Sequence, residues 1–249
     1  MEIIIEAEKI FAIWGFPVTN TLLTTWMVVA FFIVLVSFLQ RHTSLVPQGL
    51  QNLLEFVIEM FLGLMEGIFG SREKAEKYFP LIATIFLLVL CSNWLGIFPG
   101  FGSLGFWEEH EGRRMFVPLF RSAASDLNFT LALGIIAVFS VQAFGIAAIG
   151  FVKYAKKYFT FSNPLLTFVG LLEFLSEIVK IFSFSFRLFG NVFAGEVLLL
   201  SIAALAPYIV PLPFLFLEVF VGFVQALVFA MLTLVFIGMA VTEHSEEHQ

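Results

Sequence analysis

A narrow polar stripe runs along an otherwise apolar stretch in the last third of the chain. Spacing of three or four residues places its members on one helical face: they are Ser176, Lys180, Ser183, Arg187, Asn191 and Ala194. The guanidinium of Arg187 stays charged at every physiological pH, and at the centre of a membrane helix this charge costs about 2.5–3.5 kcal/mol. A charged residue that is present in a membrane helix despite this cost usually has a function, so we expect Arg187 to act on an ion. The alternative is an arginine that reaches the membrane interface or pairs with a structural acid.

The next apolar stretch carries Glu218 and Gln225, which lie seven residues apart and therefore on one helical face. If the two stretches form an antiparallel hairpin that turns near Pro207, residues whose numbers add to about 413 lie at one depth. Gln225 is then level with Arg187, and Glu218 is level with Glu196. We therefore expect the amide oxygen of Gln225 to accept a hydrogen bond from the Arg187 guanidinium.

Glu196 and Glu218 would lie roughly 10–14 Å nearer the outer surface than Arg187, at 1.5 Å per residue. Two acids close together at low dielectric do not both ionise readily, so this pair would share a proton, which suits a proton relay. The alternative is two unrelated acids that reach water from opposite faces. On the inner side, a second aqueous pocket is predicted, with interfacial solvation as the alternative for its charged members: Glu173, Ser176, Glu177 and Lys180.

The composition is that of a membrane protein. The chain has 249 residues, of which 60% are hydrophobic and 13% charged, and its mean hydropathy is +0.99. No soluble domain needs so much apolar surface. The net charge of −6 comes without a basic tract, which argues against nucleic acid as a partner. No phosphate-binding loop, metal-binding motif or nucleophile motif is present, so we expect no cofactor, no metal and no catalytic site of its own.

We expect an all-α polytopic membrane protein that forms a single membrane domain over residues 1–249. It should contain about five transmembrane helices plus one interfacial amphipathic helix, with the last two helices forming a long tilted hairpin. The expected segments are an outside N-terminal segment at 1–18, a span at 19–40, the interfacial helix at 47–69, a span at 79–98, an outside loop at 100–125, a span at 127–151, long helices at 164–205 and 208–242, and a cytoplasmic tail at 243–249. The helix at 164–205 would be roughly 60 Å long in a hydrocarbon core about 30 Å thick, so it must tilt, bend or follow the interface.

Polar residues at the ends of these segments set the topology. Basic residues place 41–77 and 152–160 in the cytoplasm by the positive-inside rule, which leaves the amino terminus outside and the carboxyl terminus inside. Asp126 can cap the helix that follows it; the alternative is that Asp126 and Asn128 line a water-filled vestibule. The acidic face of the helix at 47–69 favours a protein partner, with simple solvation as the alternative.

Several motifs resemble subunit a of the F-type ATP synthase of bacteria. They are the run Ser185–Asn191 (SFRLFGN), Ala194-Gly195-Glu196, Gln225-Ala226 and, earlier in the chain, Pro47–Asn52, Ser92–Gly96 and Asp126–Thr130. The resemblance covers nearly the whole chain. It implies a multi-pass protein of the bacterial inner membrane that belongs to a proton-translocating ATP synthase and contacts the lipid bilayer, the ring of c subunits, the peripheral-stalk subunit b and, indirectly, the F1 sector.

The same resemblance implies that Arg187 is the essential stator arginine that faces the c-ring carboxylate, with Gln225 and Asn191 beside it. A proton would enter through an outer half-channel near Glu196 and Glu218 and leave through an inner one. The implied proton path comprises Glu196, Glu218, Glu173, Glu177, Ser176, Lys180, Ser183, Asp126 and Asn128. The family often pairs an acid with a histidine where this chain has two acids, and the ring itself decides between H⁺ and Na⁺.

An independent ion channel or secondary transporter is the alternative function. The single membrane arginine, without a second substrate site or an internal repeat, argues against it. An intramembrane enzyme would need a nucleophile or a metal set, which the sequence lacks.

Overall fold

The computed structural model describes residues 7–41, 48–98, 100, 104–110, 113–158, 164–206 and 208–242. Its helices are α1 (Asn20–Arg41), α2 (Leu50–Phe69), α3 (Arg72–Ile97), α4 (Leu127–Ile149), α5 (Phe151–Tyr158), α6 (Pro164–Leu205) and α7 (Pro211–Thr242). Among the described residues, five helices are long and apolar enough to cross a membrane: α1, α3, α4, α6 and α7. The predicted class, an all-α polytopic membrane protein with five spanning helices, is confirmed.

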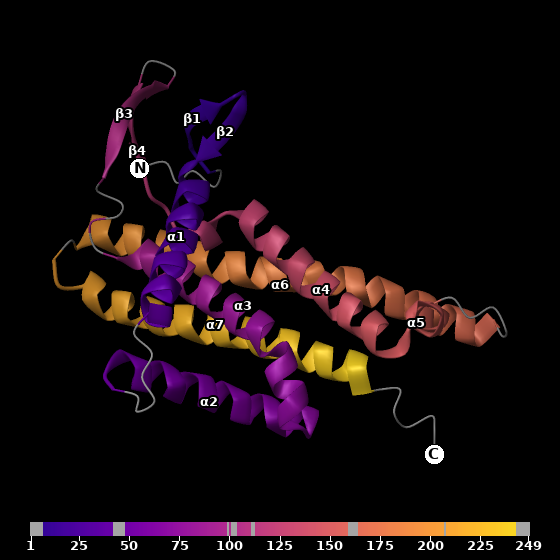
Figure 1. Ribbon diagram of the computed structural model, residues 1–249. Coiled ribbons are helices and arrows are strands. Elements are labelled where there is room, and N and C mark those ends of the chain that lie inside the picture. Colours follow the sequence, from indigo (N-terminus) through magenta and orange to yellow (C-terminus); the bar gives the residue numbers. More distant parts are fainter. Residues whose placement is uncertain are drawn as a thin grey trace.

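The last two spanning helices form the predicted long hairpin. Figure 1 shows α6 and α7 side by side, while α1 runs steeply across their direction. Helix α6 contains 42 residues, and at 1.5 Å per residue it extends over about 63 Å, twice the thickness of the hydrocarbon core. If α1 stands across the bilayer, α6 and α7 are therefore strongly tilted, which accommodates their length.

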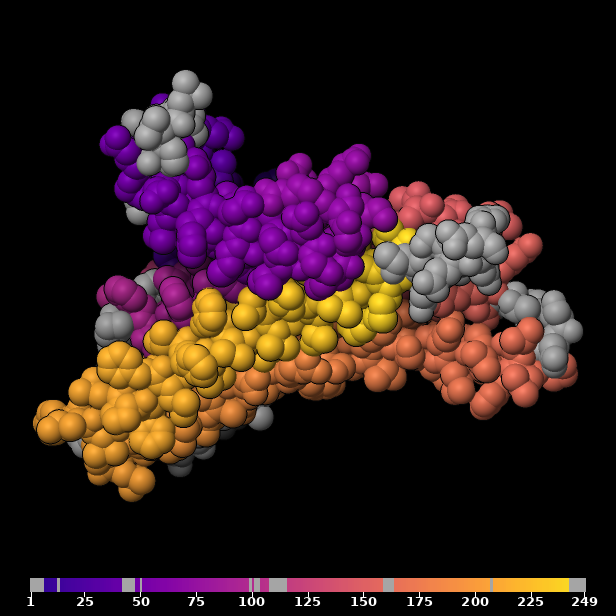
Figure 2. All heavy atoms as spheres, turned by 90° about the horizontal axis from the view of Figure 1, so that it is seen from below, coloured from indigo at the N-terminus to yellow at the C-terminus, as the bar shows by residue number. Residues whose placement is uncertain are grey.

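The hydrophobic core lies where α3, α4, α6 and α7 meet. Its largest fully buried side chains include Ile82 of α3, Leu188 of α6 and Phe229 of α7. Helix α2 covers α3 and α7 through Phe61, Leu62, Met65 and Phe69, and Figure 2 shows it against α7. Its opposite face, with Glu55, Glu59 and Glu66, is exposed, so α2 has the amphipathic character predicted for 47–69. Residue 47 lies outside the described residues.

Helix α3 begins earlier than the span predicted at 79–98. The charged residues between 72 and 77, which precede the predicted span, form its first helical turns. Arg72 donates to both carboxylate oxygens of Glu59 on α2 at 2.7 Å. These hydrogen bonds lower the pKa of the Glu59 carboxyl below its ordinary value. Charge pairing between the two helices thus accounts for the extra turns.

Two short β-hairpins were not predicted. Strands β1 (Lys9–Ile13) and β2 (Phe16–Thr19) pair before α1, and β3 (Gly105–His110) pairs with β4 (Arg113–Pro118) inside the segment predicted as a loop. Figure 1 shows both hairpins at the same end of the helix bundle. Trp107 and Phe116 lie directly opposite each other with ring centroids 5.4 Å apart, a cross-strand pair that stabilises such a ribbon.

A close approach between α4 and α6 predicts the first mutational effect. A Cβ added to Gly134 would lie 2.6 Å from Ser185 Oγ and 3.0 Å from the Ile181 carbonyl oxygen. Gly134→Ala should therefore destabilise the protein by about 1–3 kcal/mol through overpacking. The apparent Tm of the detergent-solubilised protein measures this loss.

Gly67→Ala in α2 is the matched control, because no described atom lies within 4 Å of the added Cβ. It should leave the Tm unchanged or raise it slightly, since alanine favours a helix more than glycine does. Equal Tm values for the two variants would contradict the tight α4–α6 contact.

Candidate functional site

Arg187 lies on the face of α6 that points away from the helix bundle. Its neighbours on either side differ sharply, because Phe186 is 53% exposed whereas Leu188 is fully buried against the core. Within the part of the chain that the structure describes, the hydrogen-bond partner of its guanidinium is Ser183, whose Oγ accepts from Nη2 at 3.4 Å. The surrounding exposed face is largely apolar, with Val179 and Phe182, and it also carries the polar side chains of Ser183 and Asn191. The fixed positive charge is therefore presented to whatever covers this face.

Gln225 on α7 is bound by Asn191 and not by Arg187. Its buried Oε1 accepts from Asn191 Nδ2 at 2.8 Å. Asn191 lies one turn beyond Arg187 on the same stripe of α6, and both residues are exposed, but it is the Asn191 amide that reaches Gln225. The expected hydrogen bond from Arg187 to Gln225 is thus wrong for this structure, although both residues lie at the predicted depth.

The hairpin register places Glu218 against Gly195. A Cβ added to Gly195 would lie 2.6 Å from Glu218 Oε1, and the two residue numbers add to 413, as the predicted register requires. Only a glycine lets the carboxyl group approach the α6 backbone this closely. Glu218 is half-buried, and its Oε2 has no hydrogen-bond partner among the described residues.

A small pocket between α3, α6 and α7 joins these polar groups. It is lined by Asn93, Ile97, Asn191, Val192, Glu218, Val221, Gly222 and Gln225. Asn93 Nδ2 donates to the Gly222 carbonyl at 3.0 Å, while Asn93 Oδ1 and Gln225 Nε2 are buried without a described partner. Buried polar atoms of this kind are usually satisfied by ordered water. The sequence reasoning missed Asn93 as a pocket residue, although it lies in the Ser92–Gly96 motif.

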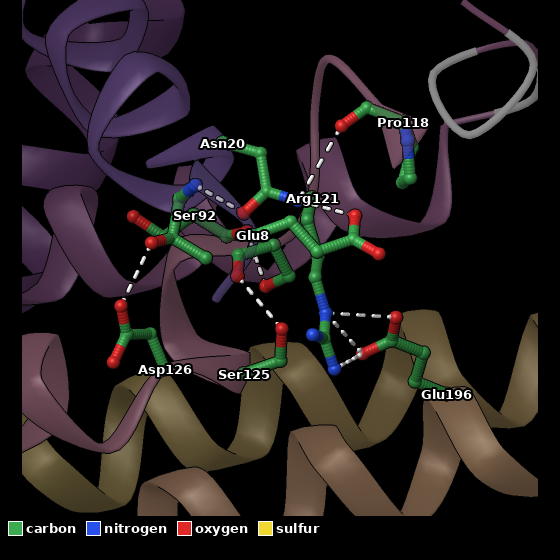
Figure 3. Close-up of polar contacts among 10 residues, drawn as sticks. Glu8, Asn20, Ser92, Pro118, Arg121, Ser125, Asp126 and Glu196 are labelled. Carbon is green, nitrogen blue, oxygen red and sulfur yellow. Dashed lines mark hydrogen bonds and ion pairs between the residues drawn. The ribbon is translucent and has the colours of Figure 1, made fainter. Parts of the chain in front are cut away.

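Glu196 forms an ion pair that the sequence did not predict. Arg121, from the segment between β4 and α4, donates from Nε to Oε1 at 3.1 Å and to Oε2 at 3.3 Å, and from Nη2 to Oε2 at 3.3 Å. Figure 3 shows the guanidinium directed at Glu196. The two acids are therefore not equivalent: Glu196 has a cationic partner, whereas Glu218 Oε2 has no hydrogen-bond partner among the described residues. That the two acids share a proton stays a prediction.

Asp126 caps α4, which confirms the capping interpretation. Its Oδ1 accepts from the Asn128 backbone N–H at 2.8 Å, and its Oδ2 accepts from Thr21 Oγ1 on α1 at 2.8 Å. Both carboxylate oxygens are thus occupied by structural contacts that tie α1 to the start of α4. The side chain of Asn128 is exposed.

A second polar cluster joins α4, α5 and the first part of α6. Lys180 donates to Glu177 Oε1 at 2.7 Å, while the Oε2 atoms of Glu173 and Glu177 are buried without a described partner. Gln142 Oε1 accepts from the hydroxyls of Tyr154 and Tyr158 at 2.5 and 3.2 Å. Burial, together with the nearby charge of Glu177, raises the pKa of Tyr158. Ser176 on α6 is exposed.

Neither cluster resembles a metal site. Among the described residues, no group of three or more histidine, cysteine, aspartate or glutamate side chains is placed to hold a metal ion. The sequence reasoning did not identify Gln142, Tyr154 or Tyr158, because isolated tyrosines and glutamines at the end of a span carry no distinctive signal.

Comparisons with known proteins identify one family. The model of the family described as ATP synthase A chain matches residues 22–238. An ATP synthase subunit a from Gloeobacter violaceus is 37% identical over 92% of this chain and 86% of its own. A protein of the same name from Campylobacter jejuni is 38% identical over 80% of each chain. Another, from Moorella thermoacetica, is 30% identical over 96% of this chain and 99% of its own.

The cap at Asp126 gives a prediction about stability. Asp126→Ala removes the capping oxygen, which costs about 0.5–2 kcal/mol, and leaves the Thr21 hydroxyl without its acceptor. Asp126→Asn keeps an oxygen that can cap, so it should retain most of the wild-type Tm of the detergent-solubilised protein. If the asparagine variant loses as much as the alanine variant, the negative charge matters and capping alone does not explain the residue.

Proposed function

The chain belongs to the ATP synthase A chain family, and we propose that it conducts protons through two offset half-channels and couples this flow to rotation of the c-ring. As a member of the family it is a multi-pass subunit of the membrane sector of ATP synthase. Arg187 is the stator arginine in this proposal.

The position of Arg187 carries the proposal. Its guanidinium lies on an exposed apolar face of α6, while its neighbour Leu188 is buried in the core. A partner that buries this face and brings a carboxylate to Arg187 would make the charge useful, because a nearby cation favours the ionised form of a carboxyl group. A ring of c subunits has these properties. The arginine then releases each ring proton and blocks direct leakage between the half-channels.

The same position argues against the alternative function. A channel or transporter that works alone must enclose its ion path within its own helices. In this chain the polar pocket around Glu218 is small and Arg187 points away from the bundle. The ion path is completed only by a partner on the α6 face.

The polar clusters on either side of Arg187 supply the two half-channels. The outer one is the pocket lined by Asn93, Glu218 and Gln225, with Glu196 at its edge. The inner one is the cluster around Glu173, Glu177 and Lys180. Ser176 lies within the same stretch of α6, and Ser183 lies between that cluster and Arg187. Because Asp126 uses both oxygens in structural contacts, we leave Asp126 and Asn128 out of the path.

The remaining surfaces fit the other partners expected of such a subunit. The exposed acidic face of α2 offers a contact for the peripheral-stalk subunit b.

The basic residues of α5, Lys153, Lys156 and Lys157, place that helix in the cytoplasm by the positive-inside rule. With five spans, the amino terminus is then outside and the carboxyl terminus inside a bacterial inner membrane.

Removing the charge at 187 tests the proposal. Arg187→Ala in the assembled synthase should abolish ATP-driven proton pumping into inverted vesicles, while ATP hydrolysis by the soluble sector continues. Arg187→Lys should also lose most pumping, because an ammonium is a compact point charge that can deprotonate when desolvated. Lys153→Ala is the control, since this lysine is exposed on α5, and it should pump normally. Wild-type pumping by Arg187→Ala would refute the proposal.

Gln225→Leu should impair pumping more mildly than Arg187→Ala. The substitution removes the acceptor of Asn191 Nδ2 and leaves that donor unsatisfied, but it keeps the guanidinium. Proton pumping per ATP hydrolysed measures the coupling. A loss as complete as that of Arg187→Ala would mean that Gln225 itself takes part in proton transfer.

A further inference from the structure

Arg121, the arginine of the segment between β4 and α4, has a largely buried side chain. The side chain is 9% exposed, and that of its partner Glu196 is 32% exposed. Three hydrogen bonds of 3.1–3.3 Å join the guanidinium to the two carboxylate oxygens. A partly buried pair with several charge-assisted hydrogen bonds is much stronger than an ordinary surface ion pair. The contact links residues 75 positions apart in the chain.

The backbone on both sides of Arg121 is fixed by other helices. Asn20 Nδ2 at the start of α1 donates to the Pro118 carbonyl at 3.4 Å, and Ser122 Oγ donates to the Ser92 carbonyl of α3 at 3.0 Å. Ser122 also packs against Gly96, where any added Cβ would overlap it. Figure 3 shows the contact from Asn20 to Pro118 beside the arginine. The backbone around Arg121 is therefore held in place by contacts with α1 and α3 while its side chain contacts Glu196.

The two acids of the outer pocket, Glu196 and Glu218, differ in their hydrogen-bond partners. Both oxygens of Glu196 accept from Arg121, whereas Glu218 Oε2 is buried without a described partner and lies in the pocket with Asn191 and Gln225. An oxygen without a partner can take up a proton and pass it on. An oxygen that already accepts from a guanidinium is a poor proton carrier.

We infer that Arg121 is a positioning residue of the outer half-channel: it holds Glu196 as the anion of a fixed ion pair and leaves Glu218 as the carboxyl that takes up and releases protons. The inference rests on the proposed function. The charge of Arg121 offsets part of the repulsion between Glu196 and an ionised Glu218. Without Arg121, the bare charge of Glu196 would favour a proton that stays on Glu218.

A double-mutant cycle in the assembled synthase tests this assignment. ATP-driven proton pumping is measured in inverted vesicles that contain equal amounts of the subunit by immunoblot. Arg121→Gln and Glu196→Gln each leave one unpaired charge, and each should slow pumping about tenfold. The double variant Arg121→Gln/Glu196→Gln removes both charges and should recover to within about threefold of wild type. Glu218→Gln should stop pumping in either background.

The double variant separates the two roles of Glu196. If Glu196 carries protons itself, the double variant lacks a carrier and cannot pump, which overturns the inference. Arg121→Lys provides a second test that does not need the double variant to assemble: it keeps the ion pair and should pump faster than Arg121→Gln. Equal pumping by these two variants would also overturn the inference.

The same vesicles keep this result separate from the proposed function. Pumping by Arg187→Ala refutes the proposed function whatever the Arg121 variants do. An inactive Arg187→Ala together with an inactive Arg121→Gln/Glu196→Gln refutes only the role assigned to Arg121.

Discussion

Charges at membrane depth must be paired, hydrated or placed against a partner, and this constraint organises the polar residues of α6. Glu177 pairs with Lys180 in its N-terminal half and Glu196 pairs with Arg121 near its C-terminal end. Between these two pairs, Arg187 has only a long contact to Ser183 within the described chain. Such a charge is costly at membrane depth, and in the proposed function another subunit supplies its counter-charge on this exposed face.

Small residues let the polar groups come together. Gly195 allows the Glu218 carboxyl to lie against the α6 backbone, and Gly134 allows α4 to approach Ser185. In lipid, where the hydrophobic effect does not drive helices together, close packing at small residues and hydrogen bonds between helices hold the bundle. The bond from Asn191 to Gln225 is one such contact, so α6 and α7 are joined beside the arginine. Among the described residues, Arg187 itself makes a hydrogen bond to Ser183 of its own helix and none to α7.

Much of the fold followed from simple sequence patterns. The apolar runs predicted five spans, Pro164 marks the first residue of α6, and the hairpin register agrees with the contact between Gly195 and Glu218. The register aligns the two helices only to within about one turn. Arg187 and Asn191 lie one turn apart on the same stripe, so the register could not decide which of them contacts Gln225, and the structure joins Gln225 to Asn191. The ion pair of Arg121 could not be predicted, because its partner lies 75 residues away and nothing in the local sequence distinguishes it from Arg113 and Arg114. The β-hairpins are too short, and too interrupted by glycine and charge, to give a clear alternating pattern.

Disulfide cross-linking to the c subunit tests most directly whether the Arg187 face meets the ring. Phe186 and Leu188 flank the arginine, but the first is 53% exposed and the second is fully buried, so they form a matched pair. After Cys91→Ser, either Phe186→Cys or Leu188→Cys is combined in the assembled synthase with a cysteine placed beside the ring carboxylate. Mild oxidation should cross-link Phe186→Cys to the c subunit and leave Leu188→Cys unlinked. A cross-link from Leu188→Cys alone, or from neither position, would contradict the proposal that this face of α6 meets the c-ring.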